Sequence, residues 1–201
     1  VGGGFARYST DMQWKVPHFE KMLYDNAQLL SLYSKAYRMN PDRLYEQVVR
    51  ETVDFLAEEL TAENGAFYSA LDADSEGKEG KFYIWTKEEL QEILGNDFAI
   101  AEAYYNINSY GFWEEENYVL IRKDSDEEVA KSLDLEMDVM LDRLEKIKAQ
   151  LKEEREKREK PGLDDKSLTS WNALTIKGLA DAYLTFGEED YLAKALKNAA
   201  F

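Results

Sequence analysis

The sequence contains no cysteine, and it has only one histidine and three prolines among its 201 residues. Without cysteine the chain can form no disulfide, no thiolate metal site and no thiol redox centre. Basic residues are also scarce, because 25 Lys and Arg stand against 41 Asp and Glu and give a net charge of −16. Nucleic acids and anionic membranes select for surfaces rich in Lys and Arg, so we expect neither as a partner.

Long apolar runs are absent as well. No stretch approaches the roughly 18 to 20 apolar residues of a membrane span, and no signal peptide is visible. Apolar residues nevertheless make up 44 % of the chain and aromatic residues 13 %, which is enough for a packed core. We therefore expect a cytoplasmic protein that folds as a single domain over residues 1–201.

The two ends of the sequence are typical of a piece of a longer polypeptide. The chain begins at Val1 without an initiator Met and closes at Phe201 in a helix-forming stretch that has no stop signal. We expect the remainder of the same polypeptide to cover its apolar edges. A homo-oligomer formed through these exposed edges is the alternative.

Apolar residues at three- and four-residue spacing predict a series of helices. The first runs over residues 17–39. Asn40 as N-cap and Pro41 then predict a second helix, which ends near Gly65. Because the turn between them is short, the two helices should form an antiparallel hairpin. Further helices are predicted over residues 86–95, 97–105, 134–160, 168–186 and 188–201.

The stretch 152–160 consists entirely of charged residues. Glu153 and Lys157, like Glu154 and Arg158, stand four residues apart in the order that favours an ion pair on a helix. We interpret this stretch as the solvated end of a helix, with a partner-binding tail as the alternative.

Two short aromatic stretches, residues 67–71 and 81–85, have the composition of strands. They flank the acidic, glycine-bearing segment 72–80, so we predict a β-hairpin with a long loop, and one more short strand over 118–122. The expected fold class is mainly α, built from helix pairs, with a small β-hairpin insertion.

The first candidate cluster surrounds His18, the only histidine, and continues to Tyr24 and Asp25. We predict His18 in the first turn of a helix, where the helix dipole favours the neutral ring and so suits acid–base work. The alternative is a structural histidine that is bonded to nearby backbone.

The second cluster is the acidic segment itself. Asp72, Asp74 and Glu76 alternate, so an extended backbone would place their side chains on one face. Such a set could bind a hard cation or supply a carboxylic acid beside an ionised partner. The helix–loop–helix calcium site is excluded, because its twelfth position is Tyr83 where a glutamate is needed. We expect no metal site; a solvated acidic turn is the alternative.

The third cluster precedes and opens the helix over 168–186. Asp165 or Ser167 could cap this helix, while Trp171 and Asn172 lie in its first turn. Each cluster lies at the start of a helix or in a hairpin between helices, and in a ring of helix pairs these ends gather at one mouth of the ring. Trp, Tyr, Asp, Glu and Asn are the residue types that stack on sugar rings and bind their hydroxyl groups, so we expect the three clusters to bind a sugar there. His18, Asp72 and Asp74 would transfer protons, with no cofactor. The expected substrate-binding residues are Tyr24, Asp25, Trp85, Asp165, Trp171 and Asn172.

The same clusters carry a family resemblance. The matching strings are Gly2-Gly3-Gly4-Phe5, Val16-Pro17-His18-Phe19-Glu20-Lys21-Met22-Leu23-Tyr24-Asp25-Asn26-Ala27, Phe67-Tyr68-Ser69-Ala70-Leu71-Asp72-Ala73-Asp74-Ser75-Glu76-Gly77, Glu79-Gly80-Lys81-Phe82-Tyr83-Ile84-Trp85 and Ser170-Trp171-Asn172. With them the chain resembles the spermatogenesis-associated protein 20 family of thioredoxin-domain-containing proteins over nearly its whole length.

The resemblance implies a fold and a range of activities. The fold is part of an (α/α)6 toroid of the six-hairpin glycosidase or N-acylglucosamine 2-epimerase type, with the family's N-terminal thioredoxin-like domain absent from this chain. By analogy of fold it implies acid–base chemistry on a small-molecule sugar, either epimerisation or hydrolysis. A non-catalytic binding or scaffolding module that serves the thioredoxin-like domain is the alternative. Ala6 stands where the family has a histidine, and the single His18 argues against a two-histidine epimerase mechanism.

Overall fold

The computed structural model describes residues 1–201 as a mainly α chain with eight α-helices and nine strands of two residues each. The chain divides into two compact units. We call the first, comprising Val1, Tyr8–His18 and Ser75–Lys160, the mixed unit. We call the second, comprising Gly2–Arg7, Phe19–Asp74 and Pro161–Phe201, the hairpin unit. No helix is long and apolar enough to cross a membrane.

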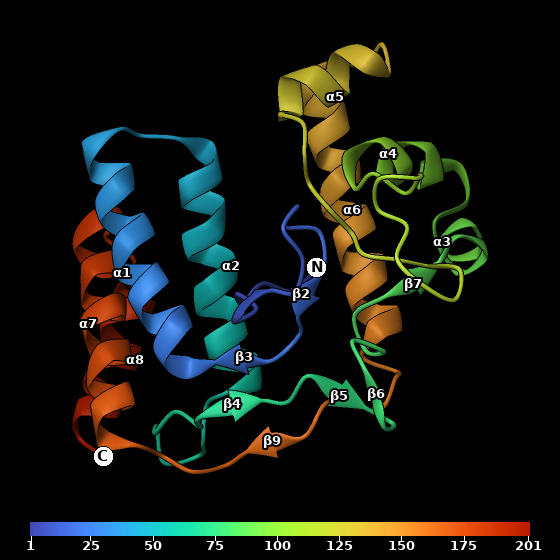
Figure 1. Ribbon diagram of the computed structural model, residues 1–201. Helices are drawn as coiled ribbons and strands as arrows, with labels where there is room; N and C mark the ends of the chain where they lie inside the picture. The colour runs from blue at the N-terminus through green and yellow to red at the C-terminus, as the bar shows by residue number, and fades with distance from the viewer. The chain divides into compact units, whose positions relative to one another are not determined.

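Two helix hairpins form the hairpin unit (Figure 1). The first consists of α1 (Leu23–Met39) and α2 (Arg43–Glu59), and the second of α7 (Thr169–Phe186) and α8 (Glu189–Ala199). Helix α1 packs against both α2 and α7, and α7 packs against α8. Gly187 ends α7 in the left-handed conformation, with φ 70°, that glycine adopts most readily. The predicted helix pairs are confirmed.

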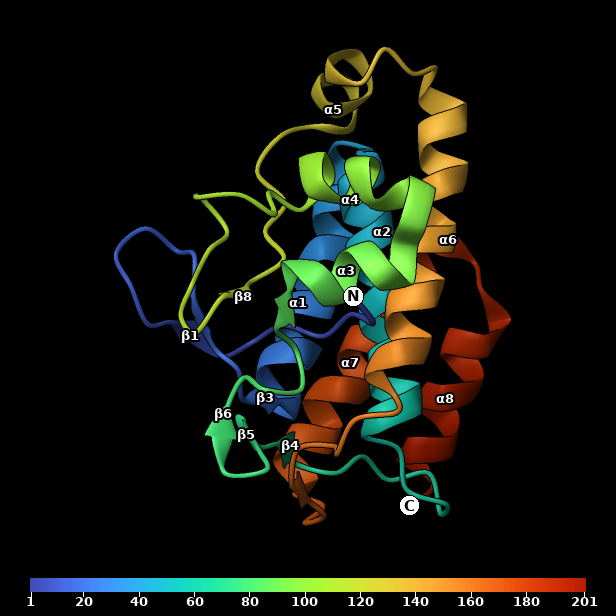
Figure 2. The ribbon, with the colours of Figure 1, turned by 90° about the vertical axis from the view of Figure 1, so that its right-hand side faces the viewer.

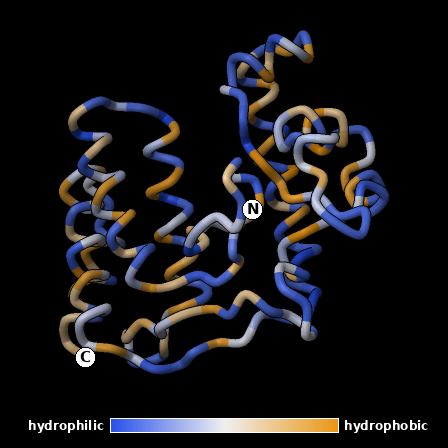
Figure 3. Tube along the Cα trace, viewed as in Figure 1, coloured by the Kyte–Doolittle hydropathy of each residue, from blue (hydrophilic) through white to orange (hydrophobic).

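Helices α1 and α7 lie unusually close together at Gly178. A Cβ atom at this position would lie 2.6 Å from the main-chain oxygen of Ala27, so only glycine allows this approach. Leu23, Leu30 and Leu56 are fully buried in the same core. Apolar segments recur along these helices in Figure 3, as expected for helices that each bury one stripe.

A three-stranded antiparallel sheet lies where α1 and α7 begin. Its order is β3 (Lys21–Met22), β4 (Ala70–Leu71) and β9 (Leu163–Asp164). Strand β3 runs directly into α1, and β9 ends five residues before the start of α7. The sheet therefore holds the first turns of both helices at the same end of the hairpin unit.

Helix boundaries differ from the predictions at two points. Pro17 and His18 form strand β2, which pairs with β1 (Tyr8–Ser9), so α1 begins at Leu23 instead of residue 17. Asp42 caps α2 by accepting a 2.7 Å hydrogen bond from the Leu44 N–H, and Asn40 instead closes α1. In both cases a nearby hydrogen-bonding partner overrides the apolar spacing.

The mixed unit contains four α-helices and three pairs of short strands. Figure 2 shows their arrangement. Strand β7 (Trp85–Thr86) pairs with β8 (Asn117–Tyr118) and leads into α3 (Lys87–Leu94). The side chains of Thr86 and Glu89 bond each other's main-chain N–H groups and so form a capping box at the start of the helix predicted over residues 86–95. The 3-10 turn η1 (Gly95–Asp97), α4 (Phe98–Tyr104), α5 (Asp126–Ser132) and α6 (Met137–Arg155) follow. Helix α5 was not predicted.

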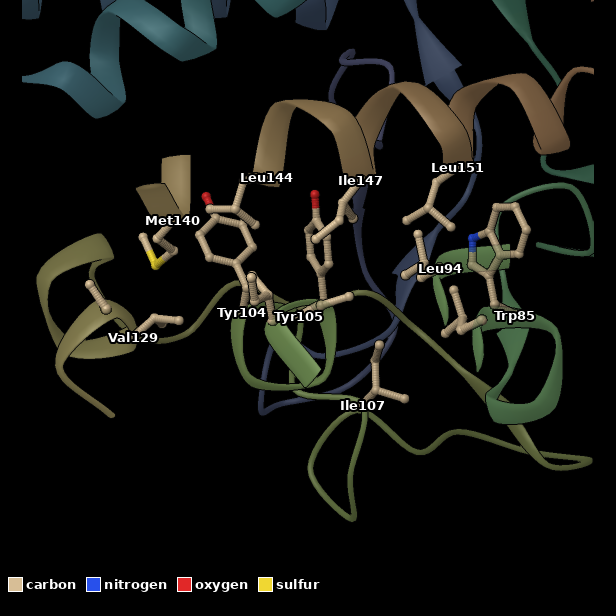
Figure 4. Close-up of a cluster of buried hydrophobic side chains, with 14 residues drawn as sticks. Trp85, Leu94, Tyr104, Tyr105, Ile107, Val129, Met140, Leu144, Ile147 and Leu151 are labelled. Carbon is tan, nitrogen blue, oxygen red and sulfur yellow. The ribbon is translucent and has the colours of Figure 1, made fainter. Parts of the chain in front are cut away.

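The core of the mixed unit is built on one face of α6 (Figure 4). Met140, Leu144, Ile147 and Leu151 recur along this face and are all buried. They pack against the aromatic and aliphatic side chains of the preceding segments, so the apolar spacing that predicts a helix over residues 134–160 corresponds to the buried face of α6. The other labelled members in Figure 4 are Trp85, Leu94, Tyr104, Tyr105, Ile107 and Val129.

The predicted β-hairpin between residues 67–71 and 81–85 is wrong. Strand β4 pairs with β3 and β9, and β7 pairs with β8, so the two stretches pair with other partners. A smaller hairpin of β5 (Asp74–Ser75) and β6 (Lys78–Glu79) forms inside the acidic segment, and Gly77 turns it with φ 74°. Strands of two residues are selected by tertiary packing, which their composition does not reveal.

Candidate functional site

His18 forms a close pair with Glu79 in the mixed unit. The Nδ1 atom of His18, on β2, lies 2.7 Å from Oε1 of Glu79 at the end of β6. The Tyr8 ring stacks on the imidazole with the ring centroids 4.7 Å apart and the planes 21° apart. The antiparallel register of β1 and β2 places Tyr8 opposite His18 and so produces this stacking.

This pairing defines what the imidazole can do chemically. When the ring is neutral, the Glu79 carboxylate accepts a hydrogen bond from the Nδ1–H group, which leaves the lone pair on Nε2. When the ring is protonated, the same contact is an ion pair. The side chain of His18 is 22 % exposed, so the ring is held but still accessible to a small molecule. A histidine oriented in this way by a carboxylate is suited to general acid–base work.

Glu79 also lines a cleft of about 730 Å³ in the mixed unit. This volume falls within the range of small-molecule sites. Trp113 supplies its aromatic surface, whereas Phe82 is only 3 % exposed, and Asn117 supplies an amide. Its charged lining residues are Glu76, Lys78, Glu79, Lys81, Glu89, Glu114, Glu115, Lys157, Arg158 and Glu159.

The cations of the cleft are already engaged by carboxylates. Lys78 lies 2.9 Å from Glu115, and Lys81 lies 2.6 Å from Glu76. The hydrogen bond from Glu115 raises the pKa of Lys78 above its ordinary value. The cleft therefore offers hydrogen-bond acceptors and an aromatic face more than free positive charge.

Arg158 organises one wall of this cleft. Its guanidinium lies 3.8 Å from the centroid of the Trp85 ring, and Nη1 donates a 2.6 Å hydrogen bond to the carbonyl of Ile84. Burial lowers the pKa of Arg158 from its ordinary value. Arg155 is only 4 % exposed, and its Nη1 donates to the Val1 carbonyl at 2.6 Å. The interpretation of residues 152–160 as a solvated helix end is thus wrong for both arginines.

A second group of candidate residues lies in the hairpin unit, at the first turns of α1 and α7. The rings of Tyr24 and Trp171 meet edge to face with centroids 4.8 Å apart. Arg7 Nη1 lies 3.1 Å from Glu20 Oε2 just before α1. Two residues predicted from separate clusters, 147 positions apart in the sequence, are therefore brought into contact by the packing of α1 against α7.

Asp25 belongs to the same end of α1. Its Oδ2 atom is buried and makes no hydrogen bond. Burial raises the pKa of this carboxyl, and the charge of Arg7 together with a hydrogen bond from Tyr24 opposes the rise. A carboxyl with a raised pKa holds its proton to higher pH, which is a property of catalytic acids.

Asp72 and Asp74 are exposed and alternate with the buried residues Ala73 and Ser75. Asp72 and Asp74 therefore lie on the same exposed side of their segment as predicted, whereas Glu76 has φ 52° and does not continue an extended backbone. Asp72 Oδ1 accepts a 2.6 Å hydrogen bond from the N–H of Ala73. No three or more histidine or acidic side chains of the chain converge in a way that could hold a metal ion.

Two predicted substrate-binding residues lie in the interior. Trp85 is 2 % exposed within the core of the mixed unit. Asn172 is 5 % exposed, and its amide exchanges hydrogen bonds of 2.8 and 3.1 Å with the main chain of Phe67. Both side chains are engaged within the protein, so we leave them out of the site proposed below.

Asp165 lies exposed before α7 and does not cap it. The N-cap is Leu168, without a side-chain bond, so the capping alternative for Asp165 and Ser167 is wrong. Lys166 forms an ion pair in the same segment, with its Nζ 3.0 Å from Asp164 Oδ2.

The candidate residues are thus distributed over the two units. His18 and Trp85 lie in the mixed unit, and Tyr24, Asp25, Asp72, Asp74, Asp165, Trp171 and Asn172 lie in the hairpin unit. Their convergence at one mouth stays a prediction. Sequence reasoning missed Glu79, Tyr8 and Arg158 as parts of a site. Glu79 stands 61 residues from His18, and no local pattern signals a pairing over that separation.

Comparison with known proteins supports the motif-based resemblance. The chain is 35 % identical to spermatogenesis-associated protein 20 of Homo sapiens, a match that covers all of this chain and 29 % of that protein. The protein of the same name in Mus musculus is 34 % identical with the same coverage, and an uncharacterized protein of Caenorhabditis elegans is 34 % identical over 31 % of its length. No family model matches the chain.

The chain is therefore related over its whole length to the spermatogenesis-associated protein 20 family, as its motifs predict. It spans about three-tenths of the length of the curated relatives that it matches. About seven-tenths of each relative therefore has no counterpart in this chain.

Three solved structures share a general likeness with the chain. D-mannose isomerase has a TM-score of 0.35 at 14 % identity, covering 98 % of this chain and 44 % of that chain. Cellobiose 2-epimerase from Spirochaeta thermophila has 0.33 at 14 % identity, covering 98 % and 46 %. A sugar epimerase from a ruminal bacterium has 0.31 at 15 % identity, covering 99 % and 79 %. All three TM-scores are too low to carry an argument about fold or activity.

Proposed function

We propose that this chain contributes an acid–base site for a small polyhydroxylated molecule of the sugar class, centred on His18 and Glu79. The observation that carries the proposal is the 2.7 Å contact between His18 Nδ1 and Glu79 Oε1, because Glu79 in turn lines a cleft of about 730 Å³. The contact orients the ring, and the cleft has room for a monosaccharide or disaccharide.

The sugar class is supported by the residues that line the cleft. Trp113 offers an aromatic face, and the Asn117 amide and several carboxylates offer hydrogen-bond partners for hydroxyl groups. An aromatic face together with acceptor-rich walls matches the two kinds of surface that a sugar ring presents. The family resemblance implies the same class of substrate.

Epimerisation is the reaction that the pair serves with fewest additional groups. Nε2 of the neutral His18 ring takes a proton from the carbon beside the carbonyl of an open-chain sugar; the C–H electron pair forms a C=C bond, and the π pair of the C=O bond moves onto oxygen to give an enolate. The carbonyl re-forms as a water molecule donates a proton to the opposite face of that carbon, and the imidazolium returns its proton to the resulting hydroxide, with no net oxidation or reduction. Glu79 stabilises the imidazolium that exists between the two steps.

Proton exchange with the solvent tests this proposal directly. The protein is incubated in D₂O with a panel of aldohexoses and cellobiose, and incorporation of deuterium beside the carbonyl carbon is followed by NMR. We expect His18→Ala to reduce the exchange rate by about 10² to 10⁴, the usual contribution of a general base. Glu79→Gln should reduce it less, because the ring remains but loses its orientation.

Glu88→Gln is the matched control for Glu79→Gln, because Glu88 is an exposed glutamate on α3 that does not line the cleft. It should leave the exchange rate unchanged. Exchange that is the same in the His18→Ala variant as in the unaltered protein would contradict the proposal.

A non-catalytic binding role is the second candidate, and one loop of the mixed unit favours it. Met12 is 98 % exposed and Trp14 is 82 % exposed. Asp11 fixes the loop by accepting hydrogen bonds from the N–H groups of Gln13 and Val16 at 2.6 and 2.7 Å. Large apolar side chains on an ordered loop are typical of a protein contact. Calorimetry with a separately prepared thioredoxin-like domain of a relative, using Trp14→Ser as the comparison, tests this role.

A further inference from the structure

The hairpin that carries Glu79 is held on both flanks by the residues that follow α6. On the side before the hairpin turn, Ser75 Oγ donates a 2.6 Å hydrogen bond to the main-chain carbonyl of Glu159. On the other side, Arg158 Nη1 donates to the carbonyls of Lys81, Phe82 and Ile84 at 3.3, 3.3 and 2.6 Å. Two consecutive residues therefore fix the segments that enter and leave β5 and β6.

A short turn over residues 80–84 links Arg158 to Glu79. The carbonyl of Gly80 accepts hydrogen bonds from the N–H groups of Tyr83 and Ile84 at 2.8 and 3.2 Å. The three carbonyls that Arg158 binds belong to this turn, and Glu79 immediately precedes it. Fixing the turn fixes the direction in which the Glu79 side chain leaves the backbone.

Arg158 is itself held rigidly. Its guanidinium covers the Trp85 ring at 3.8 Å, and Trp85 is 2 % exposed in the core that α6 organises. A second contact joins it to Glu89 at 3.4 Å. A planar guanidinium can bind several carbonyls while it stacks on an indole, which the ammonium group of lysine cannot do.

We infer that Arg158 is a positioning residue that holds Glu79 against His18. The side chain of Glu79 is 43 % exposed, so holding it against His18 costs conformational entropy. This cost is smaller when the backbone of Glu79 is already fixed. Arg158 supplies that fixation from the core of the mixed unit. The catalytic importance of this role rests on the function proposed above, whereas the positioning itself does not.

The single histidine makes the positioning measurable. In a ¹⁵N NMR spectrum of the imidazole, every histidine signal belongs to His18, and the shifts report which ring nitrogen carries the proton. At a pH where the ring is neutral, the unaltered protein should show the proton on Nδ1, facing Glu79. Glu79→Gln should move the signals towards the other tautomer, which defines the full effect of losing the carboxylate.

Arg158→Lys is the decisive variant, because it keeps the positive charge and an aliphatic stem over Trp85 but loses the planar fork. We expect it to produce most of the change that Glu79→Gln produces. In the exchange assay it should reduce the rate roughly 10- to 100-fold, as expected for a misplaced catalytic group. Arg143→Lys is the matched control, since the Arg143 guanidinium binds Asp97 at 2.6 Å elsewhere in the same unit. It should change neither the ¹⁵N shifts nor the exchange rate.

Each outcome decides a different claim. Unaltered ¹⁵N shifts in folded Arg158→Lys, with the expected change in Glu79→Gln, would overturn the positioning role and leave the proposed function standing. If the ¹⁵N shifts change in Arg158→Lys but the unaltered protein exchanges no sugar proton, the positioning role is supported and the proposed chemistry is overturned. If Arg158→Lys does not fold, Ser75→Ala tests the other flank of the hairpin, and unchanged shifts there would count against the inference.

Discussion

The side-chain amide of Asn198 donates a 2.7 Å hydrogen bond to Oδ1 of Asn172, and both side chains are buried between α7 and α8. Asn172 Oδ1 also accepts from the N–H of Phe67, while its Nδ2 donates to the carbonyls of Phe67 and Leu168. Both N–H groups and the carbonyl oxygen of the Asn172 amide are therefore engaged inside the hairpin unit, whereas Oδ1 of Asn198 is buried without a hydrogen bond. The amide ties the start of α7 to α8 and to the segment before β4.

Replacing Asn172 should therefore lower stability. Asn172→Ala removes the partners of the buried Phe67 N–H and carbonyl and one acceptor of the buried Asn198 amide, and we expect a loss of about 2–4 kcal/mol in the free energy of unfolding. Urea denaturation followed by circular dichroism measures this loss. Asn96→Ala, at an exposed position, is the control and should change stability by less than about 0.5 kcal/mol. A variant as stable as the unaltered protein would return Asn172 to the set of substrate-binding candidates.

Gly178 gives a second prediction about the same unit. Alanine is normally favoured over glycine inside a helix by about 1 kcal/mol. At Gly178 the added methyl group would lie 2.6 Å from the Ala27 carbonyl of α1, so the helices must move apart. We expect Gly178→Ala to destabilise the protein by about 1–3 kcal/mol. Leu184→Ala, on an exposed part of α7, is the comparison, and a stabilised Gly178→Ala variant would show that the helices are not in close contact.

Asp181 should make stability depend on acid pH. Burial alone would raise its pKa, but hydrogen bonds from Lys177, Ser31 and Lys35 outweigh burial and lower the pKa from 3.8 to about 2. Its Oδ2 lies 2.7 Å from Lys177 Nζ and 2.5 Å from Ser31 Oγ. Because the folded-state pKa lies below the unfolded-state value, the unfolded chain binds protons first as the pH falls.

The resulting stabilisation is fully present above pH 4 and is lost as the pH falls towards 2. Its size is about 2 kcal/mol. Urea titrations at several pH values should show a weaker pH dependence between 4 and 2 for Asp181→Asn, together with lower stability at pH 7. An Asp181→Asn variant with the same acid profile as the unaltered protein would show that the network with Lys177 contributes no measurable stability.

Asp72 and Asp74 stay predicted proton-transfer residues, and their exposure makes them easy to test. Neither side chain is buried, so Asp72→Asn and Asp74→Asn should change the free energy of unfolding by less than about 0.5 kcal/mol. If either carboxylate transfers a proton, turnover of the sugar in the full-length protein should be lost. Solvent exchange measured beside thermal denaturation separates the two effects. Turnover that survives both substitutions would leave these residues as parts of a solvated turn.

Local chemistry made much of the helical architecture predictable. The capping box of Thr86 and Glu89 and the left-handed Gly187 act within one helical turn, so the sequence around them is sufficient to place the start of α3 and the end of α7. The apolar stripe of α6 is a property of residues three and four apart. Tyr24 and Trp171 were singled out for their residue types and do meet.

The strands and the site needed the tertiary structure. Ala70 pairs with Asp164, and His18 contacts Glu79, over separations of 94 and 61 residues. Pro17 and His18 form a strand because Tyr8 and Ser9 lie beside them, although the apolar spacing favours a helix. Arg158, in a stretch that reads as solvated, is drawn to Trp85 and to three carbonyls.

The sequence by itself thus determined the mainly α class, the absence of thiol chemistry, the helix pairs and the family relationship. These follow from composition, from hydrogen bonds that span four residues, and from ordered motifs. Only the tertiary structure decided which strands pair, which arginine is buried and which carboxylate orients the single histidine. Such contacts join residues far apart in the chain, and their free energy is gained only when the whole unit packs.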